Sequence, residues 1–295
     1  KPTIAIFVES EIWPSIFKII NKKNIPLVLL NARITKKTFR KWFFIKNLSK
    51  ATFKNISRAY PQNNETFNYL KKLNVSNIKK IGNLKFTNNT QNNLIKFDKT
   101  LLKNLKNKKI WCASSTHPGE EIICANVHLS LKKKYKNFLT IIIPRHVSRV
   151  DKIIKEIKNL KLNIVTHSSN PQNFKDTDIY LVDTYGETKK FYQSSKIVFM
   201  GKSLTGKGGQ NPLEPARHGA AILYGPNVSN FVDTYKLLDK LKITHKINGV
   251  NSLTSMVNKL MITPNNHKNY LKVEKIGKKI LNETKDEINS LLNNE

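Results

Sequence analysis

Residues 109–144, KIWCASSTHPGEEIICANVHLSLKKKYKNFLTIIIP, contain the pattern that decides the fold. The apolar run at 109–115 predicts a buried strand, residues 118–134 predict a helix, and the run at 138–144 predicts a second strand. A helix between two buried strands is typical of a parallel sheet that is covered on both faces. Ligands of such sheets bind outside the carboxyl ends of the strands, so we expect functional residues in the turns that follow them.

The same alternation extends along the chain in both directions. We expect further strands at residues 3–9, 25–32, 56–60, 78–86, 162–168, 178–184, 196–202 and 220–225. We expect further helices at residues 13–24, 63–73, 149–160, 186–194, 212–218, 230–241, 251–262 and 266–292. The pattern therefore predicts an α/β fold with parallel sheets.

A polar segment at residues 87–99 separates two groups of predicted elements and indicates a connection between domains. We expect a first domain at 1–100, a second at 101–265 and a C-terminal helical segment at 266–295. The sequence opens without Met, directly on a predicted strand. We therefore expect the first domain to lack an N-terminal part.

The composition is strongly basic, with 52 Lys and Arg against 20 Asp and Glu and a formal net charge of +32. Only six of the basic residues are Arg, and Asn and Ile are abundant. Codon usage of an AT-rich genome is one explanation of this bias. An anionic membrane surface is a second, and nucleic acid is the weakest, because the sequence has no zinc-finger spacing and no aromatic-basic RNA-binding signature.

Cys112 and Cys124 have no metal-site spacing around them, so we expect two buried thiols in a reducing compartment. No apolar run approaches 18 residues, and no signal peptide is visible. The sequence therefore predicts no membrane-spanning helix.

Two turns of the second half carry polar residues after apolar strands. In SSTHPGEE (114–121), Pro118 suits a first helical position, and Glu120 and Glu121 would complement the helix dipole. This segment is either a helix start or a cradle for an anionic group. In IIIPRH (141–146), Arg145 is placed to contact a phosphate or carboxylate, or to form a surface ion pair.

Glycines mark two later turns. In DTYGE (183–187), Gly186 permits close backbone approach, and Glu187 lies near a helix start. In GKGGQNPLEP (206–215), we expect a capping box with Asn211 as N-cap, Pro212 as first helical residue and Glu214 closing the box. The box leaves the glycines of this segment unexplained, and they indicate a backbone that approaches a ligand.

The first half contains three shorter motifs. In VESEIWP (8–14), Glu9 and Glu11 would share one face of an extended backbone. NARIT (31–35) and GNLKF (82–86) also follow predicted strands. Lys85 is either a solvated lysine or a cation that supports developing negative charge.

Seven of these motifs, in this order, resemble the 3-deoxy-D-manno-octulosonic acid (Kdo) transferases of lipopolysaccharide synthesis. They are VESEIWP, NARIT, GNLKF, ASSTHPGEE, IIIPRH, DTYGE and GGQNPLEP, and the resemblance covers about residues 4–231. It implies a GT-B fold, in which two Rossmann-like domains face a cleft and the C-terminal helix returns toward the first domain.

The resemblance also implies the reaction. Kdo would pass from CMP-Kdo to a lipid A precursor with inversion, without a metal or another cofactor, at the cytoplasmic face of the bacterial inner membrane. Glu11 and Lys85 would support the transition state. The nucleotide would contact Ser115, Pro144, Arg145, Tyr185, Gly186, Glu187, Gly208, Gly209, Asn211, Pro212, Leu213 and Glu214. The family's general base and membrane anchor lie before the first matched strand, so we expect neither within this chain.

Two departures distinguish this chain from the family pattern. Gln210 stands where the family usually has His, and Lys202 stands where it often has Gly. Gln210 can donate a hydrogen bond but cannot carry charge. Two alternatives stay open from sequence: a GT-B transferase that uses a UDP-sugar, and a basic protein that binds membrane or nucleic acid without catalysis.

Overall fold

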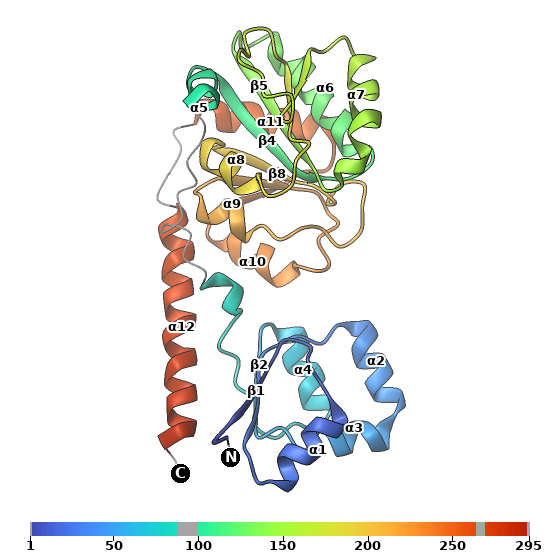
Figure 1. Ribbon diagram of the computed structural model, residues 1–295, viewed down its shortest axis with the longest axis vertical. Coiled ribbons are helices and arrows are strands. Elements are labelled where there is room, and N and C mark those ends of the chain that lie inside the picture. Colours follow the sequence, from blue (N-terminus) through green and yellow to red (C-terminus); the bar gives the residue numbers. More distant parts are fainter. Residues whose placement is uncertain (1, 88–98, 264–268, 294–295) are drawn as a thin grey trace. The chain divides into compact units, whose positions relative to one another are not determined.

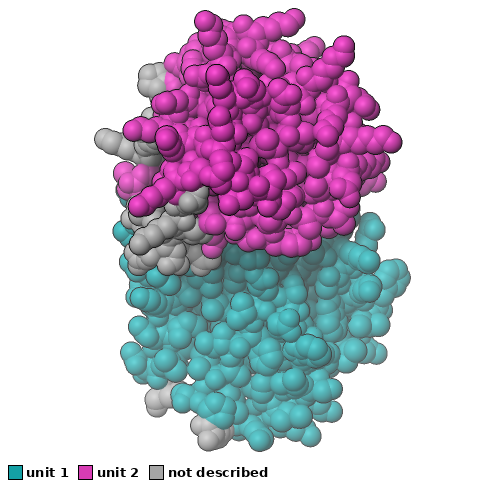
Figure 2. Space-filling view, turned by 45° about the horizontal axis from the view of Figure 1, so that its top comes forward, with its two compact units in different colours: residues 1–88, 274–295 teal, residues 89–273 magenta. Residues whose placement is uncertain are grey.

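The computed structural model describes residues 2–87, 99–263 and 269–293. They form two compact units, coloured separately in Figure 2. Unit 1 comprises residues 1–88 and 274–295, and unit 2 comprises residues 89–273. Both units are α/β structures with parallel sheets, as the alternating pattern predicts (Figure 1).

Unit 1 is built on a three-stranded parallel sheet in the order β1-β2-β3. Its strands are β1 (Ala5–Val8), β2 (Leu27–Ala32) and β3 (Arg58–Pro61). Its helices are α1 (Pro14–Lys22), α2 (Lys36–Phe44), α3 (Lys46–Phe53), α4 (Asn64–Lys72) and the 3-10 helix η1 (Leu84–Phe86). The long helix α12 (Asn269–Asn293) belongs to unit 1 from Glu274 onward.

Helix α12 is fixed to unit 1 by a charged residue near its end. The Glu287 carboxylate accepts a hydrogen bond from the Tyr60 hydroxyl at 2.8 Å and pairs with Lys79, and it lies 3.6 Å from the Arg58 guanidinium. These partners sit on or beside β3, so the first and last parts of the chain fold together.

Unit 2 contains a seven-stranded sheet in the order β10-β9-β8-β4-β5-β7-β6, with every neighbouring pair parallel. Its strands are β4 (Lys109–Thr116), β5 (Phe138–Pro144), β6 (Ile164–Thr166), β7 (Ile179–Leu181), β8 (Ile197–Met200), β9 (Ala221–Tyr224) and β10 (Thr244–Lys246). Its helices are α5 (Lys99–Lys106), α6 (Glu120–Lys132), the 3-10 helix η2 (Val147–Arg149), α7 (Val150–Lys158), α8 (Thr188–Ser194), α9 (Leu213–Arg217), α10 (Val232–Lys240) and α11 (Val250–Ile262).

The strand order of unit 2 has a reversal at its centre. The chain proceeds from β4 to β5 and outward, then returns to place β8 on the other side of β4. Crevices in doubly wound sheets open at such a switch point, outside the carboxyl ends of the two central strands. The turns after β4 and β8 therefore occupy the position where a ligand is expected.

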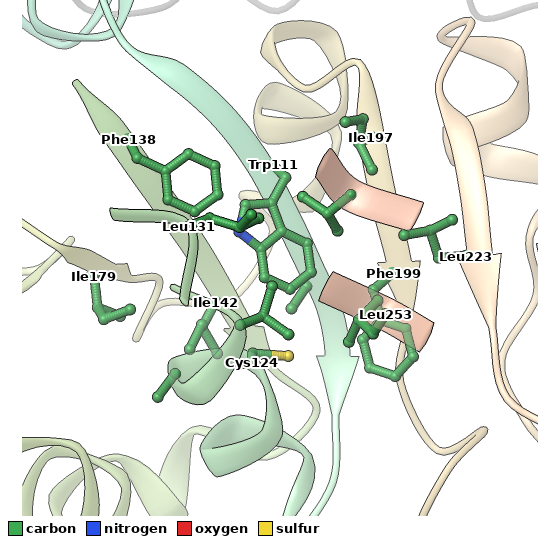
Figure 3. Close-up of a cluster of buried hydrophobic side chains, with 14 of the residues drawn as sticks. Trp111, Cys124, Leu131, Phe138, Ile142, Ile179, Ile197, Phe199, Leu223 and Leu253 are labelled. Atoms are coloured by element: carbon green, nitrogen blue, oxygen red, sulfur yellow. The ribbon is translucent and has the colours of Figure 1, made fainter. Parts of the chain in front are cut away.

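The core of unit 2 surrounds Trp111 of β4, which is fully buried with Leu131, Phe138, Ile142 and neighbouring apolar side chains (Figure 3). The indole needs one polar partner because its N–H is buried. It donates to Thr140 Oγ1 at 2.7 Å, and His128 Nδ1 lies 2.9 Å from the same oxygen. His128 Nε2 donates to Asp178 at 3.1 Å, so a polar chain links β4, β5, α6 and the residue that precedes β7.

Several element predictions need correction. Residues 78–86 form no strand: Ile78 makes a single bridge to Ala59, and the chain then turns at Gly82, whose φ is +134°. A Cβ on Gly82 would lie 2.8 Å from the Ile280 side chain, so this glycine lets the chain pass α12. Helices α2, α3 and α5 and strand β10 are absent from the sequence prediction.

The cysteines, the predicted connection and the predicted lack of a membrane-spanning helix can also be compared with the structure. Cys112 and Cys124 are free, buried thiols, as predicted. The expected connection at 87–99 falls almost entirely outside the described residues. Within the described parts of the chain, no helix combines the length and apolar character needed to cross a membrane.

Candidate functional site

The polar turns of unit 2 gather at one edge of its sheet. Because all seven strands are parallel, the segments that follow β4, β5, β7, β8 and β9 leave from the same edge. These segments are residues 117–119, 145–146, 182–187, 201–212 and 225–231. They include the sequence motifs of the second half, so the candidate site is this carboxyl edge.

Glu120 connects the two turns at the switch point. Its side chain is fully buried and accepts backbone N–H groups from His117 at 2.9 Å, Lys202 at 2.6 Å, Ser203 at 3.1 Å and Leu204 at 3.0 Å. A buried carboxylate is stable only when its oxygens are hydrogen-bonded in this way. The carboxylate therefore occupies the anion-binding position that the turn after β8 offers.

The predicted start of α6 needs correction for the same reason. The helix begins at Glu120 rather than Pro118, and Gly119 is the N-cap with φ of +90°. Glu120 is more than a complement to the helix dipole, because its main partners lie about 80 residues away in the chain. Glu121, also fully buried, forms a two-fold ion pair with Arg149 at 2.8 and 3.0 Å.

Gly201 brings the ends of β4 and β8 into direct backbone contact. Its N–H donates to Ser114 O at 2.8 Å, and a Cβ at this position would lie 2.3 Å from Ser115 O. Ser115 has a positive φ of 55°, and the strand register shifts there. The predicted nucleotide contact at Ser115 thus lies on a tightly constrained backbone at the switch point.

The turn after β5 separates a buried residue from an exposed one. Pro144 is buried at the strand end, whereas the Arg145 side chain is exposed. The Arg145 N–H donates to Thr116 O at 3.1 Å, which holds this turn against the end of β4. Within the described residues, the Arg145 guanidinium forms no ion pair closer than 4.0 Å, so it is placed to meet an anion.

The predicted capping box in the turn before α9 is wrong. Helix α9 begins at Leu213 with Pro212 as N-cap, and no side chain caps it. Asn211 Oδ1 accepts the Leu213 N–H at 3.2 Å, which fixes a local turn. Glu214 is not part of a box: its carboxylate lies 3.9 Å from Lys189 Nζ and is partly exposed.

Gly208 and Gly209 have a structural reason that the sequence does not reveal. Both are buried and have positive φ values of 95° and 69°. A Cβ on Gly208 would lie 2.4 Å from Asn230 Nδ2, and a Cβ on Gly209 would lie 3.0 Å from Asn227 O. These glycines let the turn after β8 pack against the turn after β9, a role that requires no ligand.

The turn after β7 is the most open of the set. Tyr185 is 74% exposed, and nothing lies within 4 Å of a Cβ built on Gly186, whose φ is +86°. Glu187 is the N-cap of α8 without a side-chain cap bond. Its carboxylate pairs with Lys190 at 2.5 Å and lies 3.8 Å from His167 Nε2.

Sequence reasoning missed His117 as a member of this edge. Its ring lies 5.8 Å from that of His146, and its Nε2 is 3.5 Å from Gln210 Nε2. Burial lowers the pKa of His117, and the positive charges of Lys202 and Arg149 lower it further against the opposing effect of Glu120. The imidazole is therefore neutral near pH 7. In the sequence, His117 lies in the motif SSTHPGEE close to Glu120 and Glu121, and the motif IIIPRH contains a second histidine. These positions could have indicated that His117 belongs to the candidate site.

The candidate residues of unit 1 lie at the end of β1. Glu9 has φ of +58°, which ends the extended backbone, so the prediction that Glu9 and Glu11 share one face is wrong. Glu9 pairs with Lys85 at 2.9 Å. Glu11 is exposed and accepts a hydrogen bond from Trp13 Nε1 at 2.9 Å. The structure thus brings Lys85 to the VESEIWP motif.

Within the described residues, no group of three or more His, Cys, Asp or Glu side chains is arranged to hold a metal ion. The Glu120 carboxylate instead accepts backbone N–H groups, and the Glu121 carboxylate pairs with Arg149.

Comparison with known proteins decides the family. The family model of 3-deoxy-D-manno-octulosonic-acid transferase (kdotransferase) matches residues 1–88. The 3-deoxy-D-manno-octulosonic acid transferase of Rickettsia bellii is 34% identical over 296 residues, which cover 96% of this chain and 69% of the relative. The chain belongs to this family. The transferase of Haemophilus influenzae is 32% identical over 258 residues, covering 84% of this chain and 59% of that protein.

Solved structures agree with a Kdo transferase fold. The C-terminal CMP-Kdo binding domain of WaaA from Acinetobacter baumannii superposes with a TM-score of 0.54 at 24% identity, covering 60% of this chain and 91% of that domain. A UDP-forming trehalose-phosphate synthase of Burkholderia xenovorans gives a TM-score of 0.58 at 9% identity, covering 99% of this chain and 73% of that protein. At such identities the likeness concerns the fold alone, and that fold is the predicted GT-B fold.

Membership of the Kdo transferase family identifies this chain as a glycosyltransferase. The chain spans 69% of the Rickettsia bellii relative and 59% of the Haemophilus influenzae relative. The substrates of this chain and the roles of its individual residues therefore belong to the proposal that follows.

Proposed function

We propose that this chain transfers Kdo from CMP-Kdo to a lipid A precursor in lipopolysaccharide synthesis. The acceptor hydroxyl gives its proton to a general base and attacks the anomeric carbon of Kdo, the bond to the phosphate oxygen breaks, and CMP leaves with that electron pair. The resemblance to the family places that base before the first matched strand. Attack opposite the leaving group inverts the anomeric centre, and we propose that no metal takes part. The protein acts peripherally at the cytoplasmic face of the inner membrane. Family membership, together with seven ordered motifs, supports this proposal.

The nucleotide is proposed to bind at the carboxyl edge of unit 2. One observation carries this assignment: the Glu120 carboxylate ties the turns after β4 and β8 together at the switch point. Since Glu120 already takes the N–H groups of residues 202–204, those groups are not free for a phosphate. The CMP phosphate is then expected against a side-chain cation, and the exposed Arg145 is the candidate.

Glu214 is proposed to hold the ribose. A carboxylate can accept hydrogen bonds from both ribose hydroxyls, and the absence of a cap bond at α9 leaves the Glu214 oxygens available for them. Its distance of 3.9 Å from Lys189 is long enough for a ligand hydroxyl to compete. Tyr185, Gly186 and Glu187 approach from the turn after β7 and complete the proposed nucleotide contacts.

Glu11 and Lys85 of unit 1 are proposed to support the transition state. Lys85 is held by Glu9 at 2.9 Å, which fixes the position of its ammonium group without removing its charge from solvent. A fixed cation can stabilise negative charge that develops in a transition state. Glu11 stays exposed and accepts only the Trp13 N–H among the described residues, so its second oxygen can receive a substrate proton donor.

A UDP-sugar transferase is the second candidate. The fold similarity to a UDP-forming trehalose-phosphate synthase extends over 99% of this chain. Fold alone does not select a substrate, because one fold hosts many reactions. The motif order and the 34% identity to a Kdo transferase favour CMP-Kdo over this alternative.

Calorimetric titration of CMP tests the proposed site. Arg145→Ala is expected to weaken CMP binding by about tenfold or more, since a charge-assisted phosphate contact is lost. Lys158→Ala, which removes an exposed lysine at the end of α7, is the matched control and should leave the affinity unchanged. Unchanged CMP affinity in Arg145→Ala would contradict the assignment.

Glu214→Gln separates the ribose role from a structural one. Because no side chain caps α9, the melting temperature of the ligand-free protein should stay within a degree or two. The affinity for CMP should fall by about tenfold, since an amide accepts one fewer hydrogen bond. A loss of melting temperature without a loss of affinity would reverse the assignment.

A further inference from the structure

Helices α2 and α3 of unit 1 present a cluster of large apolar side chains at their junction. Phe43 is 51% exposed, Phe44 is 87% exposed, Ile45 is 47% exposed and Leu48 is 48% exposed. The four lie within six consecutive residues, and α2 has no fully buried side chain. An apolar cluster of this kind on a protein surface marks an interaction site. We call these four residues the α2–α3 corner.

The corner is held outward by the opposite side of the same helices. Phe39 stacks on Tyr69 with ring centroids 4.2 Å apart, and Trp42 packs edge-on against the buried Phe53 at 5.2 Å. Both Phe39 and Trp42 pack on the core of unit 1. The two helices, drawn in blue in Figure 1, are thus anchored by one face. The corner cannot turn inward without breaking these contacts.

Positive charge surrounds the corner. No Asp or Glu occurs between Glu11 and Glu65, a segment that contains 12 Lys and Arg. Seven of these belong to or directly follow the two helices, and all seven are exposed: Lys36, Lys37, Arg40, Lys41, Lys46, Lys50 and Lys54. Among the described residues none of the seven forms an ion pair. Lys46 instead lies over the Phe43 ring, 5.8 Å from its centroid.

The chemistry of this surface selects a partner. Apolar side chains close to unpaired cations match a bilayer with anionic headgroups. The bilayer interior accepts the apolar side chains, and the headgroup phosphates attract the cations. A nucleic acid offers phosphates and bases that stack on aromatic rings. It offers nothing for Ile45 and Leu48, which are aliphatic. The pairing of aliphatic side chains with charge therefore favours lipid.

We propose that the α2–α3 corner inserts into an anionic lipid bilayer and that the surrounding lysines bind its headgroups. This inference deepens the proposed function, because it names the surface that brings the enzyme to a lipid acceptor. The membrane proposal and the proposed transferase function can be tested separately, because vesicle binding is measured without the transfer reaction and CMP titration is measured without lipid.

Sedimentation with vesicles tests the surface. The chain should bind vesicles of equal parts phosphatidylcholine and phosphatidylglycerol, and bind those of phosphatidylcholine alone far more weakly. Phe44→Ser should weaken binding to the anionic vesicles by about tenfold. Ile262→Ser, which removes an apolar side chain that is 65% exposed at the end of α11, is the matched control and should have no effect. Equal binding of Phe44→Ser and the unsubstituted chain would overturn the proposal.

Charge reversal tests the headgroup contacts. Lys37→Glu combined with Lys41→Glu should abolish most vesicle binding, whereas Lys155→Glu combined with Lys158→Glu on α7 makes the same change in net charge and should reduce it only slightly. Equal losses of vesicle binding in the two double variants would show that the protein adsorbs through its overall charge of +32 rather than through a defined surface, and the proposal would be wrong.

Insertion is measured by fluorescence quenching. Phospholipids brominated on their acyl chains should quench Phe44→Trp more than the unsubstituted chain, which already carries Trp42 on α2 and the exposed Trp13, and Ile262→Trp should show no such gain. If neither variant gains quenching, and Phe44→Ser weakens binding to a single-stranded RNA as strongly as binding to vesicles, the corner is a nucleic-acid surface instead.

Discussion

Glu120 shows how one buried carboxylate can hold two turns of a candidate site together. It gathers N–H groups from the turns after β4 and β8, and each charge-assisted bond of this kind contributes about 1.5–3 kcal/mol. A free phosphate could use the same groups, so the protein has filled one anion site with its own side chain. We therefore expect side-chain cations to recognise a ligand phosphate.

Asp178 gives a residue-scale prediction about pH. Burial alone would raise its pKa, but hydrogen bonds from His128, Lys132 and the Asn163 backbone outweigh this effect and lower the pKa from 3.8 to about 2. Because the pKa of Asp178 is lower in the folded state than in the unfolded state, the ionised carboxylate stabilises the fold at pH values above about 4. That stability is lost as the pH falls toward about 2. The contribution is about 2 kcal/mol.

Asp178→Asn should therefore lower the free energy of unfolding at pH 7 by about 2–3 kcal/mol. Urea unfolding at a series of pH values should show this difference shrinking between about pH 4 and pH 2. Asp233→Asn, at an exposed position on α10, is the control and should follow the unsubstituted protein. An undiminished difference at low pH would show that Asp178 titrates normally.

At the scale of elements, glycines decide how the turns of unit 2 meet. Gly201 allows the ends of β4 and β8 to touch, and Gly208 and Gly209 allow the turns after β8 and β9 to pack. The sequence contains these glycines in a suggestive motif, yet it does not say what approaches them. In the structure, protein backbone or side-chain atoms lie against each of these glycines.

Gly201→Ala tests this packing. The added Cβ would lie 2.3 Å from Ser115 O, so we expect a loss of about 3 kcal/mol in the free energy of unfolding and weaker CMP binding. Gly249→Ala is the control: nothing lies within 4 Å of its Cβ and its backbone is extended, so its cost should stay below about 1 kcal/mol. Chemical denaturation measures both, and equal losses would contradict the close approach described.

The sequence predicted most strands of unit 2, because buried parallel strands are continuous apolar runs such as residues 138–144. It also predicted that the motifs lie in the turns after them. It could not predict the partners of Glu120 or Gly201, since these come from segments about 80 residues distant. The capping box failed because Pro212 stays outside α9, although the local pattern fits a cap. Local signals thus located the turns of the candidate site, and tertiary packing determined which residues contact each other there.

At the scale of the whole molecule, the two units carry different parts of the proposal. Unit 2 holds the turns proposed for the nucleotide, and unit 1 holds Glu11, Lys85 and the α2–α3 corner. Fold similarity to a UDP-forming trehalose-phosphate synthase extends over 99% of this chain at 9% identity, whereas the Kdo transferase of Rickettsia bellii is 34% identical. The fold is therefore shared widely, and the turns must supply the specificity.

Competition between CMP and UDP tests the central claim most directly. The two nucleotides differ in the number of phosphates, one in CMP and two in UDP, and at the base, where cytosine has an amino donor and uracil has a carbonyl acceptor. A site built to bond one base rejects the other. Calorimetric titration of the chain should show one CMP site, with UDP binding at least about tenfold more weakly. Binding of UDP with equal or higher affinity would contradict the assignment of CMP-Kdo as donor.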